Sequence, residues 1–233
     1  MTMTAKLFSD FLAQIERIHN DNSDKVILYR GQPADFPLIP SIARVNPKND
    51  TTAIEAEMIA ELKRRSRLKI KTKLIDDWDW LVYAQHFGLK TRLLDWTSNP
   101  LVGLWFACSN STFYSSDGQL FVLIADEKLL LDREKDTSPF DRNKTRVYKP
   151  HLNNERIVAQ DGWFTAHAFS TSSKLFVNLR KNSLLKKNLS LISIPAHSKI
   201  AFLKQLSILG MTYEKLFPDI EGLCKQLNYE YEM

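Results

Sequence analysis

The sequence predicts an α+β fold, a single domain with a mixed sheet and flanking helices. Three observations support this. Apolar residues at helical spacing open the chain in 5–19, and short apolar runs with the length of buried strands recur at 26–31, 119–125 and 189–195. Hydrophobic residues make up 44% of the 233 residues, which is enough for a core, and no linker divides the chain.

The positions of glycine and proline, together with the spacing of apolar residues, predict the elements of the first half. After the strand 26–31, the proline-rich stretch 32–47 predicts an ordered extended loop. The next helix ends at Gly88, and Pro100 stands in the first turn of the one after it. We therefore predict helices at 53–75, 76–88 and 99–109, and a strand at 91–97.

The second half is more irregular. Residues 126–150 are charged and without pattern, which predicts a mobile insertion. Asp161-Gly162 is typical of a hairpin turn, so residues 155–160 and 163–169 are predicted as two strands. A helix is expected from a Ser198 cap to Gly210, and a last helix from about residue 218.

Composition limits the function. The net charge of +5 is compatible with a nucleic-acid or nucleotide partner. No apolar run approaches the roughly 20 residues that a membrane helix needs, and residues 1–11 lack a signal-peptide core. Two cysteines give neither a disulfide framework nor a metal cluster, so we expect a cytoplasmic protein without a metal.

The stretch LYRGQ, residues 28–32, places an arginine at the end of an apolar strand. One interpretation is that Arg30 holds an anion and Gly31 lets the ligand come near. The other is an internal ion pair at a strand end, and the stretch alone favours it.

Of all stretches of the sequence, residues 80–108 have the most polar side chains placed between apolar ones. Alternation places Arg92 with Leu94 and Trp96 on one strand face, and Asp95 on the other. A buried Asp95 needs a partner, which Arg30 or Arg92 would supply. This stretch contributes Tyr83, Gln85, His86, Arg92, Asp95 and Thr97.

In the predicted strand 155–160, Arg156 and Gln160 share a face and Glu155 lies on the other. That face could bind phosphate and amide groups, or it could simply be solvated. The basic run 63–73 is likewise either a solvated helix face or a nucleic-acid surface. Phosphate-loop, dinucleotide-loop and zinc-helix motifs are absent from the sequence.

Four stretches resemble, in order, the blocks of the FRG domain family: LYRGQ with PLIPSIAR, YAQHFGLKTRLLDWTSNPLVGLWFA, ERIVAQDGWFT and LFPDIEGL. The family is named for an aromatic-Arg-Gly motif, here Tyr29-Arg30-Gly31. The resemblance extends from about residue 25 to 228. It implies a toxin or effector of a bacterial defence or toxin–antitoxin system, with an antitoxin or other defence protein as a possible partner.

The order of the blocks also resembles that of ADP-ribosyltransferases, which implies their fold and NAD as substrate. In those enzymes an early strand ends in Arg-Gly or His, a second strand runs into a helix, and a later strand carries a glutamate. The parallels here are residues 28–31, 93–97 with helix 100–109, and 155–160. Asp95-Trp96-Thr97 departs from the usual Ser-Thr-Ser of the second strand.

The resemblance implies roles for individual residues. Arg30 would hold the pyrophosphate with Arg92 as a second contact, and Asp95 or Glu155 would be the catalytic carboxylate. The NAD site would comprise Tyr29, Arg30, Gly31, Gln32, Tyr83, His86, Arg92, Trp96, Thr97 and Gln160. The acceptor would be a macromolecule, with RNA favoured and protein next.

Two other function classes stay open. One is a nuclease that uses Asp95 and Glu155 with a divalent metal. The other is a non-catalytic module that binds a nucleotide or a protein partner.

Overall fold

A computed structural model describes residues 2–70 and 72–231. In this part of the chain seven strands form one mixed sheet, in the order β1-β9-β4-β2-β3-β6-β5. β1 pairs with β9 in parallel, and the other neighbours are antiparallel. The predicted α+β class with a mixed sheet is therefore confirmed. The strands are β1 (Thr2–Thr4), β2 (Val26–Gln32), β3 (Leu93–Thr97), β4 (Gly118–Ala125), β5 (Arg146–Tyr148), β6 (Gly162–Ala166) and β9 (Leu189–Ile194), with a separate ribbon of β7 (Phe169–Ser170) and β8 (Leu175–Phe176).

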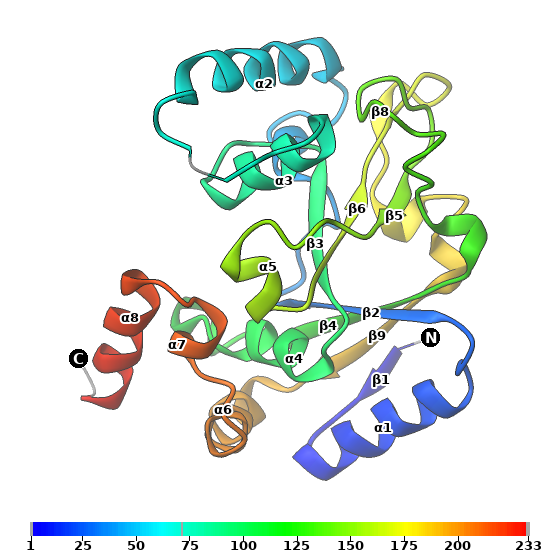
Figure 1. Cartoon of the computed structure of the whole chain (residues 1–233). Helices are drawn as coiled ribbons and strands as arrows, with labels where there is room; N and C mark the ends of the chain where they lie inside the picture. Colours follow the sequence, from blue (N-terminus) through cyan, green and yellow to red (C-terminus); the bar gives the residue numbers. More distant parts are fainter. Residues whose placement is uncertain (1, 71, 232–233) are drawn as a thin grey trace.

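Helices flank the sheet. The predicted N-terminal helix is confirmed as α1, in which Phe11, Ile15 and Ile18 are buried. Together with α4 and α6 it packs on one side of the β2-β4-β9 half of the sheet (Figure 1). No helix in the described part of the chain is long and apolar enough to cross a membrane. The helices are α1 (Phe8–Asn20), α2 (Thr52–Ser66), α3 (Asp77–His86), α4 (Pro100–Cys108), α5 (Glu155–Ala159), α6 (Lys199–Ile208), α7 (Tyr213–Leu216) and α8 (Ile220–Glu230).

The sheet opens between β2 and β3. Seven residue pairs join β2 to β4 and five join β3 to β6, whereas β2 and β3 share only the pair Tyr29 and Thr97. Figure 1 shows β3 and β6 running across the direction of β2, β4 and β9. Beyond Tyr29 the two strands therefore diverge, and Arg30 emerges at the opening.

Gly31 is needed for packing against α4. A Cβ at Gly31 would lie 1.9 Å from the carbonyl oxygen of Gly103, and a Cβ at Gly103 would lie 2.9 Å from the Cβ of Tyr29. Helix α4 thus approaches β2 so closely that both positions exclude side chains. The glycine of the Arg-Gly pair therefore has a structural cause, and the approach of a ligand to Gly31 stays a prediction.

The prediction of a strand at 155–160 is wrong, because residues 155–159 form the short helix α5. Asn154 begins this helix, and its side-chain oxygen accepts a hydrogen bond from the backbone N–H of Ile157. The Asp161-Gly162 hairpin is wrong for the same reason: Asp161, at φ 47°, turns the chain from α5 into β6. The alternation that separated Glu155 from Gln160 does not exist.

Two helix predictions need adjustment. The helix predicted at 53–75 ends at Ser66, after which closely spaced cations without an apolar stripe do not favour further turns; Lys71 lies outside the described residues. Ser198 is the N-cap residue of α6 as predicted, but its side chain does not cap the helix, because the hydroxyl donates to the carbonyl of Lys6. Gly210, at φ 80°, does follow α6 as predicted.

The segment 126–150 contains β5, which its irregular sequence did not indicate. It also contacts the rest of the molecule, because the indole N–H of Trp78 donates to the carbonyl of Asp136 at 2.8 Å. Its mobility stays a prediction.

Candidate functional site

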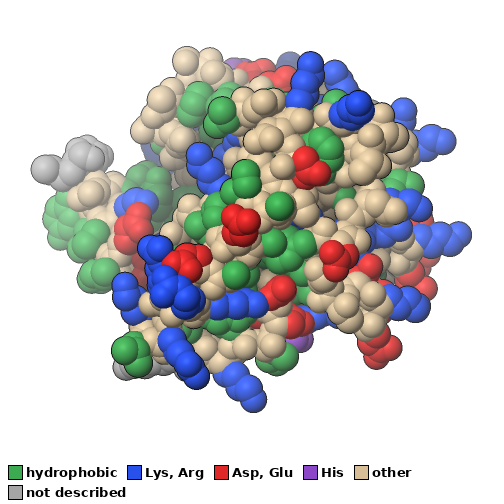
Figure 2. Space-filling model, turned by 90° about the horizontal axis from the view of Figure 1, so that it is seen from above, with side chains coloured by type: hydrophobic (Ala, Val, Ile, Leu, Met, Phe, Trp, Pro, Cys, Tyr) green, Lys and Arg blue, Asp and Glu red, His purple; other side chains and the backbone are tan. Residues whose placement is uncertain are grey.

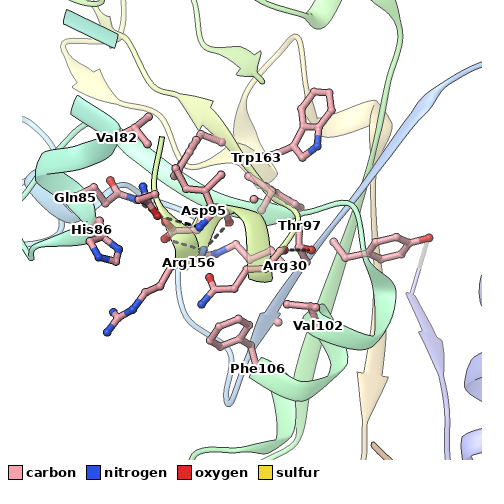
Figure 3. A pocket seen from close by; sticks show the side chains of 18 of the residues that line it. Arg30, Val82, Gln85, His86, Asp95, Thr97, Val102, Phe106, Arg156 and Trp163 are labelled. Atoms are coloured by element: carbon pink, nitrogen blue, oxygen red, sulfur yellow. Dashed lines mark hydrogen bonds and ion pairs between the residues drawn. The ribbon is translucent and has the colours of Figure 1, made fainter. Parts of the chain in front are cut away.

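A cleft of about 330 Å³ occupies the opening between β2 and β3. Side chains from both strands, from α3, α4 and α5, and from β6 line it (Figure 3). Its polar groups are Arg30, Gln85, His86, Asp95, Thr97, Arg156 and Gln160.

Arg30 and Asp95 form the centre of the cleft. The Arg30 Nη1 donates to the backbone carbonyl of Asp95 at 2.7 Å and lies 3.6 Å from a carboxylate oxygen of the same residue. The arginine side chain is 13% exposed, whereas that of Asp95 is 63% exposed. Burial lowers the pKa of Arg30, and the carboxylate of Asp95 opposes this change. The predicted pairing of Asp95 with Arg30 is confirmed, and the carboxylate still faces open space.

Gln85 orients this carboxylate. Its Nε2 donates to the Asp95 Oδ1 at 2.5 Å, while its own carbonyl oxygen accepts from the hydroxyl of Thr91. Asp95 is therefore fixed by contacts from α3 and β2, as the dashed lines in Figure 3 show. Because these contacts are made before any ligand is bound, the carboxylate is preorganised.

Arg156 differs from Arg30 in having acidic neighbours outside the cleft. Its guanidinium donates to Asp219 at 2.7 and 3.0 Å, lies 3.4 Å from Glu221, and lies over the ring of Phe217. His86 stands close by, and burial followed by the charge of Arg156 lowers its pKa. This shift favours the neutral form of the imidazole, which is the form that can accept a proton.

Thr97 and Gln160 connect the walls. The hydroxyl of Thr97 donates to the backbone carbonyl of Gln160 at 2.6 Å. The side-chain amide of Gln160 donates to the carbonyl of Leu216 at 2.9 Å. These bonds tie the end of α5 to the end of β3 and to the end of α7, so both residues position the cleft's walls.

The remaining wall is apolar and aromatic. Phe106 of α4, Trp163 of β6 and Phe217 line the cleft together with Val82 and Val102. A cleft with such walls, two guanidinium groups, a carboxylate and a neutral imidazole suits an anionic ligand that also carries a flat ring.

Eight of the twelve predicted site residues line the cleft: Tyr29, Arg30, Gly31, His86, Asp95, Trp96, Thr97 and Gln160. The other four do not. Gln32 lies in an adjoining hollow, and Tyr83 packs against Phe87 with ring centroids 4.8 Å apart. Arg92 and Glu155 also lie outside the cleft, for different reasons.

Arg92 is a structural residue. Its Nε donates to Glu55 at 2.6 Å, its Nη1 donates to the carbonyl of Pro139, and both charged side chains are buried, at 1% and 0% exposure. The guanidinium is enclosed by Glu55 of α2 and by the segment around Pro139, so it does not line the cleft.

Glu155 faces away from Asp95. It is exposed and lines an open groove that it shares with Leu152 and Lys215. As the first residue of α5, it is directed outward, while Arg156 and Gln160 reach the cleft from the same helix. The predicted carboxylate pair of Asp95 and Glu155 is not brought together.

The site prediction missed Gln85, Phe106, Arg156, Trp163 and Phe217, which also line the cleft. Gln85 and Arg156 lie in the polar stretches that the sequence indicated, but their orientation depends on the helices. The aromatic residues have the pattern of ordinary core residues. No group of three or more His, Cys, Asp or Glu side chains within residues 2–70 and 72–231 could hold a metal ion.

Comparison with known proteins gives one match. No curated protein and no solved structure matches the chain. Residues 25–115 match the model of the FRG domain, and this range contains Tyr29-Arg30-Gly31 together with β3 and α4. The stretches 155–165 and 216–223 lie outside it. The strands that open to form the cleft, with Arg30 and Asp95 between them, therefore lie within the range that matches the FRG domain.

Proposed function

We propose that the cleft binds NAD and transfers its ADP-ribose group to a macromolecular acceptor. One observation carries the proposal: the Asp95 carboxylate is fixed beside the Arg30 guanidinium, inside a cleft with aromatic walls. The opening of the sheet at this point also supports an ADP-ribosyltransferase-like arrangement, in which the early Arg-Gly strand and the following strand flank the dinucleotide.

The reaction needs little covalent help from the protein. The bond between ribose C1′ and the nicotinamide nitrogen breaks, and its electron pair stays with the nitrogen, so nicotinamide leaves as a neutral molecule. A lone pair on an acceptor nitrogen or oxygen forms the new bond to C1′, and the acceptor releases a proton. Positive charge develops on the ribose in between, as in glycoside hydrolysis.

Asp95 is the carboxylate suited to stabilise that charge. Its position is fixed by Gln85 and Arg30, and it faces the open cleft. Glu155 is excluded from this role because it lines a different groove. His86, whose lowered pKa favours the neutral imidazole, lines the same cleft and would take the acceptor's proton.

Arg30 would hold the pyrophosphate. Its Nε has no hydrogen-bond partner in the described part of the chain and is available to an anion. Trp163 or Phe106 would pack against the nicotinamide ring, in place of Tyr83 and Trp96, the aromatic residues that the resemblance to ADP-ribosyltransferases had included in the NAD site with Tyr29. Trp96 is 3% exposed, and its indole N–H already donates to Thr165.

The experiment is incubation of the protein with NAD labelled in its adenylate part, together with RNA, DNA and protein from a cell extract. We expect label in one macromolecular fraction and free nicotinamide in equal amount. Asp95→Asn should reduce turnover about a hundredfold, because an amide cannot stabilise the developing charge. Asp24→Asn, a change of the same kind at an exposed position on the surface, should not.

The alternatives give different results. Binding of NAD without release of nicotinamide would replace the transferase by a binding module. Cleavage of RNA or DNA that requires a divalent metal would replace it by a nuclease. For the role in the cell, we propose a toxin or effector on the family resemblance. Expression of the wild-type chain should then arrest bacterial growth, and expression of Asp95→Asn should not.

A further inference from the structure

A second hollow, of about 400 Å³, adjoins the cleft and shares Arg30 and Gly31 with it. Its other wall comes from the proline-rich loop after β2, through Phe36, Ile39 and Arg44. Arg30 therefore stands at the junction of two sites. The NAD cleft occupies one side of it, and the proposed function assigns no ligand to the other.

Gln32 gives the hollow an unused hydrogen-bond acceptor. The side chain lines the hollow and the residue is 5% exposed, yet its Oε1 has no hydrogen-bond partner within residues 2–70 and 72–231. Buried side-chain oxygens are satisfied in most native structures. A ligand that donates an N–H group would satisfy this one.

Arg44 supplies positive charge that no acidic residue neutralises. Its Nε lies 3.5 Å from the carbonyl of Ile39, and no carboxylate in the described part of the chain forms an ion pair with it. Asp35 is the acidic residue of this loop, and it is paired with Arg180. The hollow thus contains two guanidinium groups, Arg30 and Arg44, and their mutual repulsion contributes to lowering the pKa of Arg30.

A second basic segment lies against the same loop. The backbone N–H of Leu179 donates to the carbonyl of Leu38 at 3.2 Å, which anchors the stretch 179–188 there. This stretch carries the exposed cations Arg180, Lys181, Lys186 and Lys187. On the face that Figure 2 shows, cations and acids are mixed. A basic rim beside a cationic hollow favours a polyanion.

Phe36 provides a flat surface at the entrance. It is 40% exposed, and an edge-on contact with Phe113, at 5.3 Å between centroids, supports its ring. An exposed aromatic ring among cations is the arrangement on which single-stranded nucleic acids stack their bases. A duplex would not offer an unstacked base to such a ring.

We propose, on the basis of the proposed function, that this hollow binds one nucleotide of a single-stranded nucleic-acid acceptor. The base stacks on Phe36 and donates an N–H group to the Oε1 of Gln32, while Arg44 contacts a phosphate. Because the hollow and the cleft share Arg30, the bound nucleotide lies next to the ribose that Asp95 activates.

The test is fluorescence anisotropy with labelled 12-nucleotide single strands of RNA and DNA and with a duplex, all without NAD. We expect the single strands to bind more tightly than the duplex, and the comparison of RNA with DNA identifies the acceptor. Phe36→Ala should weaken binding roughly tenfold. Arg44→Ala should weaken it similarly and reduce the slope of log affinity against log salt by roughly 0.7. Arg17→Ala removes an exposed arginine from α1 and should change little.

Three outcomes would overturn the assignment. Either variant could bind single strands as the Arg17→Ala control does. The same variants could weaken NAD binding in calorimetry, which would mean that the hollow binds another part of NAD and not the acceptor. Label could also enter only the protein fraction in the NAD experiment. Because strand binding is measured without NAD, an absence of NAD turnover would contradict the proposed function and leave this result intact.

Discussion

Two arginine–carboxylate pairs on neighbouring strands have opposite environments. Arg92 and Glu55 are both buried, and Glu55 also accepts the backbone N–H of Arg92. In the pair Arg30 and Asp95, the arginine is largely buried, but the acid is 63% exposed and faces a cleft. Each arginine has one buried nitrogen without a hydrogen-bond partner in the described part of the chain, Nη2 of Arg92 and Nε of Arg30. The difference lies in the acid, because Glu55 is enclosed by the protein whereas the Asp95 carboxylate is open to a ligand.

The difference follows from where each strand opens. Near Arg92 the sheet is closed, because Leu93 and Leu94 of β3 pair with β6. The side chain of Arg92 is covered there by α2 and by the segment around Pro139. β2 separates from β3 after Tyr29, so Arg30 reaches into the gap. The same residue type thus serves folding in one place and, in the proposed function, ligand recognition in the other.

The largest expected effect is on the buried pair. Arg92→Met should lower the free energy of unfolding by about 3–5 kcal/mol, because it leaves the carboxylate of Glu55 buried without its partner. Chemical denaturation measures the change. The double variant Arg92→Met with Glu55→Leu should recover much of the loss, since it removes both charges. A single variant as stable as the wild type would show that the pair does not hold α2 to β3.

The cleft pair should respond in binding instead. Arg30→Lys should weaken NAD binding about tenfold, because one ammonium group cannot reproduce the guanidinium fork. Calorimetry measures the affinity, and thermal denaturation should show a folded protein. Arg17→Lys, at an exposed position on α1, is the matched control. Wild-type affinity in Arg30→Lys would contradict the anion contact, and equal loss of folding and affinity would make Arg30 a structural residue like Arg92.

The comparison also shows what the sequence could predict of the fold. Elements such as α1, α3 and α4 have periodicity or end signals over several turns, and they appear close to their predicted places. β1 and β5 have three residues each, too few to establish a period. In α5, five residues fit an alternating pattern as well as a helix, and the Asn154 cap was the decisive feature that the pattern obscured.

For the site, polar residues inside apolar strands were informative. Arg30 and Asp95 stood out for that reason, and they do meet in the cleft. Arg92 stood out equally, but its partner Glu55 is 37 positions away on a helix whose orientation the sequence does not specify. Phe106 and Trp163 could not be found, because an aromatic residue that lines a cleft has the same local pattern as one in the core.

The smallest expected effect concerns His167, whose pKa is influenced by the charges of both Arg30 and Arg92. The residue is 1% exposed, and its backbone N–H donates to the carbonyl of Arg92. Burial lowers the pKa of His167 to about 3, and the charges of Arg30 and Arg92 add to the effect. The imidazole is therefore neutral in the folded protein, whereas in the unfolded chain its pKa is about 6.5.

The sign of the pH dependence follows. Between about pH 6.5 and pH 3 the unfolded chain binds a proton at His167 that the folded chain does not bind. The contribution of this residue to stability is complete above pH 6.5 and falls with decreasing pH, by at most about 1.4 kcal/mol per unit. Urea denaturation at pH 7, 6 and 5 should show a shallower decrease in His167→Gln than in the wild type. His197→Gln, at an exposed position, should follow the wild type. Parallel curves for wild type and His167→Gln would mean that His167 is protonated in the folded protein, and that the charges of Arg30 and Arg92 are compensated there.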